Sequence, residues 1–147
     1  MTNKSAFDTL LRIKKSYKIF NRMDNDDIRS ICTDVKFRKY KANEIIFEEG
    51  TVDNNIHCII EGKVSVYTAI SFSPIRTLSN GDVFGEISAA TGKKRIATLV
   101  ATSDSVLLQF RFMDKSLNLE ALNKVYVNLI DLLSDKLEYA NHSTLQI

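Results

Sequence analysis

Histidine and cysteine are scarce in this chain, and each shortage excludes a class of site. Two histidines and two cysteines stand among 147 residues. A metal enzyme built on a small β barrel needs two or three histidines converging with a carboxylate, so metal catalysis is not expected. Cys32 and Cys58 both lie in apolar segments. We therefore expect reduced, buried thiols at both positions instead of a disulfide.

Several catalytic and targeting motifs are also missing. The sequence contains no Gly-x-Ser-x-Gly elbow and no P-loop, and Gly81, Gly85 and Gly92 are too widely spaced for a dinucleotide fingerprint. No apolar run reaches the length of a signal peptide or of a membrane span, so we expect a cytoplasmic protein. These absences favour a binding protein over an enzyme.

Positive and negative charges are nearly equal in number, with 20 lysines and arginines against 18 aspartates and glutamates. The resulting net charge of +2 is too small to indicate nucleic acid or an anionic membrane as a partner. The basic cluster of Lys36, Arg38, Lys39 and Lys41 indicates a solvated edge strand, where charge discourages pairing with another sheet. The length and the 44% hydrophobic content fit a single globular domain.

Short helices are predicted before the first strand. Residues 6–16 place four apolar side chains at near-helical spacing: Phe7, Leu10, Leu11 and Ile13. Asp24 is a good N-cap for a second helix over residues 25–32. We assign residues 1–32 to an N-terminal helical segment.

From Thr33 onward the hydrophobic period changes from helical to alternating. Short alternating runs separated by turn signals follow: residues 35–40, 44–48, 56–61, 64–66, 75–78, 97–101 and 106–112. Asn43 is expected in a left-handed turn. Three residues of the last run are expected to point outward: Leu107, Gln109 and Arg111. The pattern predicts a mainly β protein with flanking helices, in which residues 33–112 form a jelly-roll barrel of about eight strands.

The remainder, residues 113–147, is predicted to form a C-terminal helix and tail. Its apolar side chains fall in two stripes: Leu122, Tyr126, Leu129, Leu133 and Ala140 in one, and Val125, Leu132 and Tyr139 in the other. Together they occupy more of the helix circumference than one barrel face can cover. The outer stripe predicts a homodimer through a short coiled coil, or a protein effector. The alternative is an intramolecular core helix, with the extra stripe under the N-terminal helices.

The segment from Gly81 to Thr98 combines turn glycines with two opposite charges. Gly85 permits close backbone approach because it lacks a Cβ atom, and Glu86 opens a single helical turn whose free N–H groups would face an anion. Arg95, nine residues later, supplies a planar fork that matches a phosphate. A carboxylate and an arginine across a tight turn suit a ligand with both a hydroxyl and an anion, such as a phosphorylated sugar.

This segment resembles the phosphate-binding cassette of cyclic nucleotide-binding domains. The resemblance lies in Phe-Gly-Glu-Ile-Ser at residues 84–88 and Arg-Ile-Ala-Thr at residues 95–98. Such domains occur in the catabolite activator protein family, in regulatory subunits of cAMP-dependent protein kinase and in nucleotide-gated channels. The resemblance covers about residues 19–137. It implies a regulatory module that binds a cyclic purine nucleotide, cAMP more than cGMP, and signals through ligand-driven movement of the C-terminal helix. No helix-turn-helix is seen after that helix, so either a stand-alone domain or a piece of a longer protein is expected.

The resemblance also assigns roles to individual residues. The implied ligand-binding set is Val83, Phe84, Gly85, Glu86, Ile87, Ser88, Arg95, Ile96 and Ala97. Glu86 would accept a hydrogen bond from the ribose 2′-hydroxyl, and Arg95 would pair with the cyclic phosphate. Backbone N–H groups of the cassette would complete the phosphate's shell, Val83 and Phe84 would close the sugar side, and the C-terminal helix would cover the base.

Ile96 departs from the family pattern, because relatives usually carry Ala, Ser or Thr at this position. Its branched side chain could crowd the phosphate, which keeps a second hypothesis open. In that hypothesis the chain is a scaffold or interaction domain that binds no nucleotide, with Arg95 in a salt bridge and Glu86 capping the helix. If the cassette does bind, Ile96 offers no hydrogen bond to a guanine amino group, so a modest preference for adenine is expected.

Overall fold

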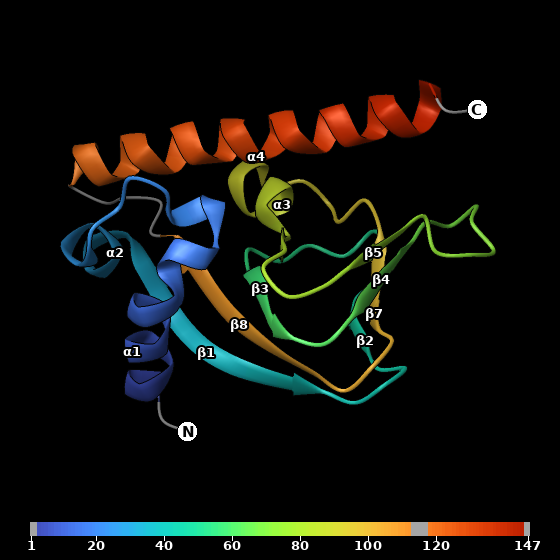
Figure 1. Cartoon of the computed structure of the whole chain (residues 1–147), viewed down its shortest axis with the longest axis horizontal. Helices are drawn as coiled ribbons and strands as arrows, with labels where there is room; N and C mark the ends of the chain where they lie inside the picture. Colours follow the sequence, from blue (N-terminus) through green and yellow to red (C-terminus); the bar gives the residue numbers. More distant parts are fainter. Residues whose placement is uncertain (1–2, 113–117, 146–147) are drawn as a thin grey trace.

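The structure, a computed structural model, describes residues 3–112 and 118–145, and Figure 1 shows their arrangement. The helices are α1 (Asn3–Ile13), η1 (Lys14–Ser16), η2 (Lys18–Phe20), α2 (Asn25–Ile31), α3 (Glu86–Thr91) and α4 (Leu119–Leu145). The strands are β1 (Cys32–Tyr40), β2 (Ile45–Phe47), β3 (Ile56–Glu61), β4 (Val64–Tyr67), β5 (Arg76–Leu78), β6 (Val83–Phe84), β7 (Thr98–Ala101) and β8 (Ser105–Phe112). The strands form a barrel, and α4 runs across one side of it, with α3 beneath its middle.

The barrel consists of two four-stranded sheets in which every pair is antiparallel. Their strand orders are β1-β8-β3-β6 and β2-β7-β4-β5. The predicted mainly β fold class is therefore confirmed. β1 lies at a sheet edge, as its basic residues indicated, and Asn43 has the expected positive φ of 76°. The register of β1 against β8 shifts at a bulge that includes Asp34, whose φ is 54°.

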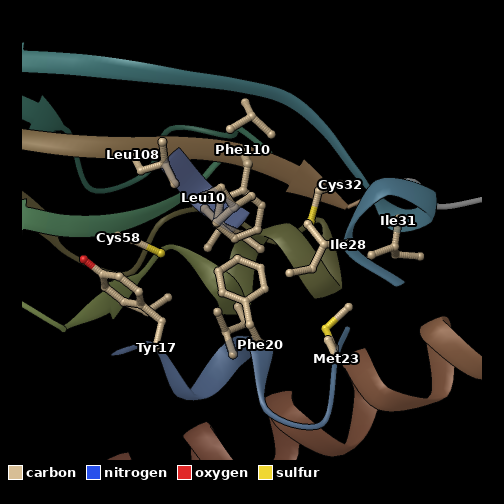
Figure 2. Packing of buried hydrophobic residues seen from close by; sticks show 14 of the residues in the cluster. Leu10, Tyr17, Phe20, Met23, Ile28, Ile31, Cys32, Cys58, Leu108 and Phe110 are labelled. Carbon is tan, nitrogen blue, oxygen red and sulfur yellow. The ribbon is translucent and has the colours of Figure 1, made fainter. Parts of the chain in front are cut away.

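Both faces of the β1-β8-β3-β6 sheet are buried. One face packs against the N-terminal helices in a cluster that includes Leu10, Phe20 and Phe110, as Figure 2 shows. The other face points into the barrel, where Leu107 belongs to a second cluster. The outward placement predicted for Leu107 and Gln109 is therefore wrong, since both are buried and only Arg111 is exposed. A central strand covered on both faces has no reason to alternate apolar with polar residues.

Asp24 caps α2 as predicted. Its side chain accepts a hydrogen bond from the backbone N–H of Asp27, and the Asp27 carboxylate accepts one from the backbone N–H of Asp24, which completes a capping box. Cys32 and Cys58 are both free and buried, as predicted. Burial raises the pKa of each thiol, so both are inert at neutral pH.

The inner face of α4 packs on the rest of the domain through five buried side chains: Ala121, Val125, Asn128, Leu129 and Leu132. The predicted grouping of Leu129 with Tyr126 and Leu133 is wrong, because Leu129 is buried while the other two are exposed. The exposed apolar side chains of the helix instead include Leu119, Tyr126, Ile130, Leu133 and Leu137. Among the described helices, none is long and apolar enough to cross a membrane.

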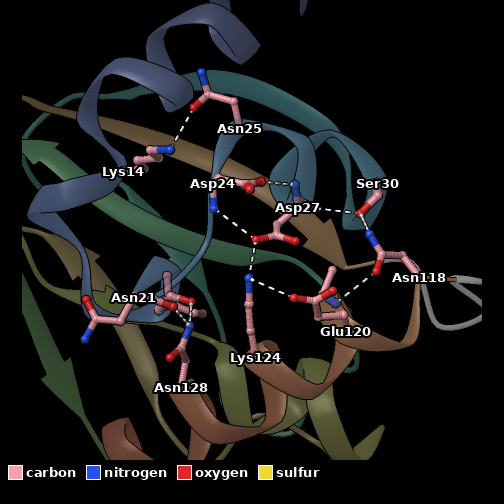
Figure 3. A network of polar contacts seen from close by, with 12 residues as sticks. Lys14, Asn21, Asp24, Asn25, Asp27, Ser30, Asn118, Glu120, Lys124 and Asn128 are labelled. Atoms are coloured by element: carbon pink, nitrogen blue, oxygen red, sulfur yellow. Dashed lines mark hydrogen bonds and ion pairs between the residues drawn. The ribbon is translucent and has the colours of Figure 1, made fainter.

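Polar contacts tie α4 to the N-terminal helices, as Figure 3 shows. Lys124 Nζ lies 2.7 Å from Asp27 Oδ2. One turn further on, the buried Asn128 amide donates to the backbone carbonyls of Ile19 and Asn21, at 2.8 and 2.7 Å. These bonds fix the position of the first half of α4 relative to η2 and α2. From Leu133 to His142 no residue of α4 is buried, so the second half of the helix is held by fewer contacts.

Candidate functional site

The predicted cassette forms a strand, a tight turn and a short helix. β6 ends at Phe84, Gly85 turns the chain with a φ of 86°, and α3 follows from Glu86 to Thr91. Gly85 stands at the N-cap and offers no side chain to bond the first-turn N–H groups of α3. Gly92 ends the helix in the left-handed conformation. The cassette therefore presents a helix N-terminus that lacks a side-chain cap.

Arg95 is the most heavily bonded side chain of this segment, and its guanidinium is nearly inaccessible. Nη2 lies 2.6 Å from Asp53 Oδ1 and donates to the Asn55 carbonyl at 2.8 Å. Nη1 donates to the Gly85 carbonyl at 2.8 Å. The guanidinium also stacks over the ring of Phe47, with its central carbon 4.3 Å from the ring centroid. A cation is thus held rigidly beside the cassette turn.

Gly85 is required at the turn for a steric reason as well. A Cβ atom there would lie 2.7 Å from Arg95 Nη1 and 2.8 Å from the Asn55 carbonyl oxygen. Because a real Cβ essentially never comes that close to another heavy atom, any larger residue would displace the arginine. The close approach predicted at Gly85 therefore brings the backbone against Arg95.

Glu86 is buried, with 1% of its surface exposed, and its partner comes from α4. Its Oε1 atom forms an ion pair with Lys136 Nζ, which also donates to the Val83 carbonyl at 3.3 Å. One turn later the Tyr139 ring lies 4.4 Å from the Arg76 guanidinium carbon of β5. The second half of α4 is therefore attached to the cassette and to the barrel rim through two cationic side chains.

The remaining predicted residues line the same segment with differing exposure. Val83, Phe84, Ser88 and Ala97 are buried, Gly85 and Ile87 are half-buried, and Ile96 is 69% exposed. The sequence-based alternative had Arg95 in a salt bridge and Glu86 as a helix cap. Arg95 does form a salt bridge, whereas Glu86 is the first residue of α3 and bonds Lys136 instead.

Sequence reasoning missed the partners of both charges, Asp53 and Lys136. Asp53 does leave a local signal, because its carboxylate accepts a hydrogen bond from the N–H of Asn55 in the Asp-Asn-Asn run before β3. Lys136 has no such signal in the sequence, because it is one of several charged residues on a long helix. Its contact with Glu86 depends on the tertiary position of α4.

Unsatisfied polar atoms gather on the barrel side of the cassette. Among the described residues, three buried side-chain nitrogens have no hydrogen-bond partner: Arg95 Nε and both ring nitrogens of His57. The His57 ring stacks on Phe84 with centroids 5.0 Å apart and lies 5.9 Å from Phe47. Burial and the nearby Arg95 charge lower the pKa of His57 to about 4, so the ring is neutral. Arg95 Nε and one nitrogen of the neutral His57 ring are donors, and a buried donor without a partner marks a place where an acceptor is expected.

The described residues contain no cluster of three histidine, cysteine, aspartate or glutamate side chains that could hold a metal ion. The groups that the site does offer are two paired charges, a helix N-terminus and the orphan donors. Together these groups suit an anion with an attached hydroxyl.

Comparisons with known proteins agree with this fold. A cyclic nucleotide-binding domain from Methylobacillus flagellatus matches with a TM-score of 0.77 at 21% identity and covers 96% of this chain and 83% of that one. The catabolite activator protein of Thermus thermophilus matches with a TM-score of 0.67 at 24% identity, over 86% of this chain and 61% of that one.

A curated relative is similar in sequence as well. The regulatory subunit of cAMP-dependent protein kinase from Blastocladiella emersonii is 25% identical over 134 residues, which are 84% of this chain. The chain spans only 33% of that relative's length. The family model for the cyclic nucleotide-binding domain matches residues 37–114. Since this match covers more than half of the 147 residues, the chain belongs to the cyclic nucleotide-binding domain family.

Proposed function

We propose that this domain is a cytosolic, non-catalytic sensor that binds a cyclic purine nucleotide, with cAMP preferred over cGMP. The observation that carries the proposal is Arg95 Nε, a buried N–H donor in the cassette without a partner. A guanidinium binds phosphate best through two parallel N–H groups, and Nε is one of the donors in its fork. A phosphate oxygen at Nε would satisfy the donor that the protein leaves without an acceptor.

The cassette supplies the rest of the ligand's polar partners. The N–H groups in the first turn of α3, at Glu86, Ile87 and Ser88, would donate to the phosphate oxygens. Glu86 would accept from the ribose 2′-hydroxyl. Val83 and Phe84 would contact the sugar, with the methyl group of Ala97 beside them. The exposed Ile96 is free to turn away from the phosphate, and it would contact the purine face without a hydrogen bond.

Ligand binding must compete with the two internal ion pairs. Asp53 neutralises Arg95, and Lys136 covers the Glu86 carboxylate from α4. A phosphate near Arg95 would repel the Asp53 carboxylate, and a ribose hydroxyl at Glu86 would share that carboxylate with Lys136. Because Lys136 belongs to α4, nucleotide binding is then coupled to the position of the helix. Movement of α4 would be the signal that a partner reads.

One observation favours a second candidate function, a scaffold that binds no nucleotide. The Asp53 carboxylate, 2.6 Å from Arg95 Nη2, already supplies the counter-charge that a phosphate would bring. A cassette that is satisfied internally can persist as structure alone. The orphan Nε weighs against this candidate, because a purely structural arginine would be expected to bond it.

The exposed face of α4 supports a second copy of the chain as the partner. Leu119, Tyr126 and Leu133 recur at intervals of seven, and Ile130 and Leu137 fall four residues after Tyr126 and Leu133. All five are at least 41% exposed. This is a heptad pattern with Leu or Tyr at one core position and Ile or Leu at the other, which suits a two-stranded coiled coil. Parallel pairing of α4 helices would bury the exposed face.

A calorimetric titration of the nucleotide-free chain with cAMP and with cGMP tests the proposal. We expect one site per chain for each nucleotide, with cAMP favoured by about 1 kcal/mol, the scale of one neutral hydrogen bond. The scaffold candidate predicts no heat and no shift of the melting temperature with either nucleotide. Equal or tighter binding of cGMP would contradict the preference for adenine while leaving nucleotide binding intact.

A further inference from the structure

A cavity lies behind the cassette helix. Its volume is about 260 Å³, and it is bounded by α3, by the first half of α4 and by the adjoining ends of β1, β3 and β8. Arg95, Asp53 and Lys136 do not line it, and Glu86 is the one proposed nucleotide-binding residue on its wall. The cavity is therefore distinct from the anion site, although both involve α3, the short helix that lies beneath α4 in Figure 1.

The walls of this cavity divide into an apolar floor and a polar rim. The floor includes Ile56, Val125 and Leu129, all buried, together with Phe112 and Leu122. The rim carries the hydroxyl of Thr33, the amide of Asn54, the phenol of Tyr126 and the guanidinium of Arg111. Water in this cavity would find hydrogen-bond partners only at the rim, because the apolar floor offers it none. An organic molecule with one polar end fits this surface better than water does.

Arg111 is held at the rim by an unusual backbone arrangement. The β1 bulge places Asp34 in the left-handed region, with a φ of 54°, and its carboxylate forms an ion pair with Arg111 Nη2. Aspartate is one of the few non-glycine residues that adopt this region, because its short polar side chain can hydrogen-bond locally. The guanidinium carries five N–H donors, more than the Asp34 carboxylate uses, so it can hold a second anion.

We propose that this cavity binds a small amphipathic monoanion. The apolar body lies on the floor formed by β3, β8 and α4, and the carboxylate or sulfonate lies against Arg111 at the rim. Such a molecule contacts α3 and α4 together, so it also sets how closely the cassette helix approaches α4. The binding claim stands on the cavity alone and does not depend on nucleotide binding.

The test is a fluorescence titration of the chain with 8-anilinonaphthalene-1-sulfonate. We expect a saturable signal at one molecule per chain, displaced by 2-naphthoate or by decanoate and not by cAMP. Displacement by only one of the two acids would tell whether the body is aromatic or aliphatic. Arg111→Gln should weaken binding roughly tenfold, the scale of one charge-assisted hydrogen bond.

Three further variants distinguish binding in the cavity from binding elsewhere on the chain. Asp34→Asn breaks the same ion pair but keeps the Arg111 charge, and asparagine tolerates the left-handed backbone, so binding should be retained or tightened. Ala90→Phe fills the cavity from the exposed side of α3 and should abolish the signal in a chain that still melts cooperatively. Ile130→Ser alters the outer face of α4, outside the cavity, and should change nothing.

Other outcomes would overturn the proposal. Loss of the signal in Ile130→Ser would place the probe on the exposed apolar face of α4. Displacement by cAMP would place it in the nucleotide site. If the probe binds Arg111→Gln and Ala90→Phe as tightly as the wild type, the cavity holds water only. The same conclusion would follow if the probe bound at many weak sites per chain.

Discussion

Arg95 is both rigidly held and incompletely bonded. Four groups fix its guanidinium: the Asp53 carboxylate, two backbone carbonyls and the Phe47 ring. Leaving Nε unbonded in a buried place costs free energy, on the order of 1–3 kcal/mol for a desolvated polar group. The structure thus holds an unsatisfied donor at the position where the proposed phosphate would lie.

Glu86→Gln tests the role of the carboxylate in recognising the sugar. The amide cannot accept as strong a hydrogen bond from the ribose 2′-hydroxyl, so cAMP affinity should fall by about 1.5–3 kcal/mol. Affinity for 2′-deoxy-cAMP should change much less. Competition binding with both nucleotides measures the ratio. A variant that still prefers cAMP over its 2′-deoxy analogue as strongly as the wild type would remove Glu86 from the sugar site.

His57→Phe tests the neutral imidazole in the barrel. The folded pKa of about 4 lies below the ordinary value of 6.5, so the unfolded chain binds a proton first as pH falls. Stability from the neutral ring is therefore present above pH 6.5 and lost as pH falls toward 4. Between pH 7 and pH 5 the wild type should lose about 2 kcal/mol more stability than His57→Phe.

Urea unfolding of both proteins at the two pH values checks this difference. The charged groups that act on His57 are Arg95, Asp53 and Arg38, and the variant keeps all three side chains. The phenylalanine variant therefore isolates the imidazole. Parallel pH profiles for the two proteins would contradict the account.

At the scale of elements, the sequence correctly predicted the features that depend on one or two neighbouring residues. The Asp24 cap, the left-handed Asn43 turn and the short helix after Gly85 all follow from one or two residues. Errors arose where burial depends on distant packing. Leu107 and Gln109 look like an outward-facing series until the opposite sheet covers them, and Leu129 joins the inner face of α4 because of how the helix rests on the domain.

In the candidate site too, the contiguous residues could be predicted from the sequence, whereas the contacts between distant residues could not. The cassette residues are contiguous, so their resemblance to a motif could be seen in the sequence. The ion pairs Asp53–Arg95 and Lys136–Glu86 join positions 42 and 50 residues apart, and no periodicity encodes them. The exposed and buried faces of α4 could be separated only when its contacts with η2 and α2 were known.

Lys136→Met tests whether α4 is coupled to the cassette. Without the ammonium group, the second half of the helix loses its bond to Glu86 and to the Val83 carbonyl. Hydrogen exchange of residues 133–142 should be faster than in the wild type. Added cAMP should speed exchange there in the wild type, because the ribose hydroxyl competes with Lys136 for Glu86, and it should have little effect in the variant.

Lys18→Met is the matched control for this experiment. It removes an exposed ion pair to Asp135 on the same half of α4, at 2.7 Å, without touching the cassette. Exposed pairs contribute little, so the response to cAMP should survive. If Lys136→Met responds to cAMP as the wild type does, the coupling runs through another contact.

For the whole molecule, assembly is tested on the exposed face of α4. Replacing Ile130 and Leu137 with serine removes two side chains that are 66% and 63% exposed, so folding should be preserved. Sedimentation should give a dimer for the wild type and a monomer for the double variant, because the coiled-coil core is lost. Ile45→Ser, which changes a 51% exposed residue of β2, should leave the dimer intact. A monomeric wild type at every concentration would contradict the heptad interpretation.

The central claim is that Arg95 binds a nucleotide phosphate in competition with Asp53. Calorimetric titration of cAMP into the wild type, Arg95→Ala and Asp53→Asn tests it most directly. Arg95→Ala should lose about 2–5 kcal/mol of binding free energy, as expected for one side of a desolvated charge pair. Asp53→Asn keeps the side-chain oxygen but removes the competing charge, so it should bind cAMP more tightly than the wild type. Unchanged affinity in Arg95→Ala, or no binding by any of the three proteins, would contradict the account.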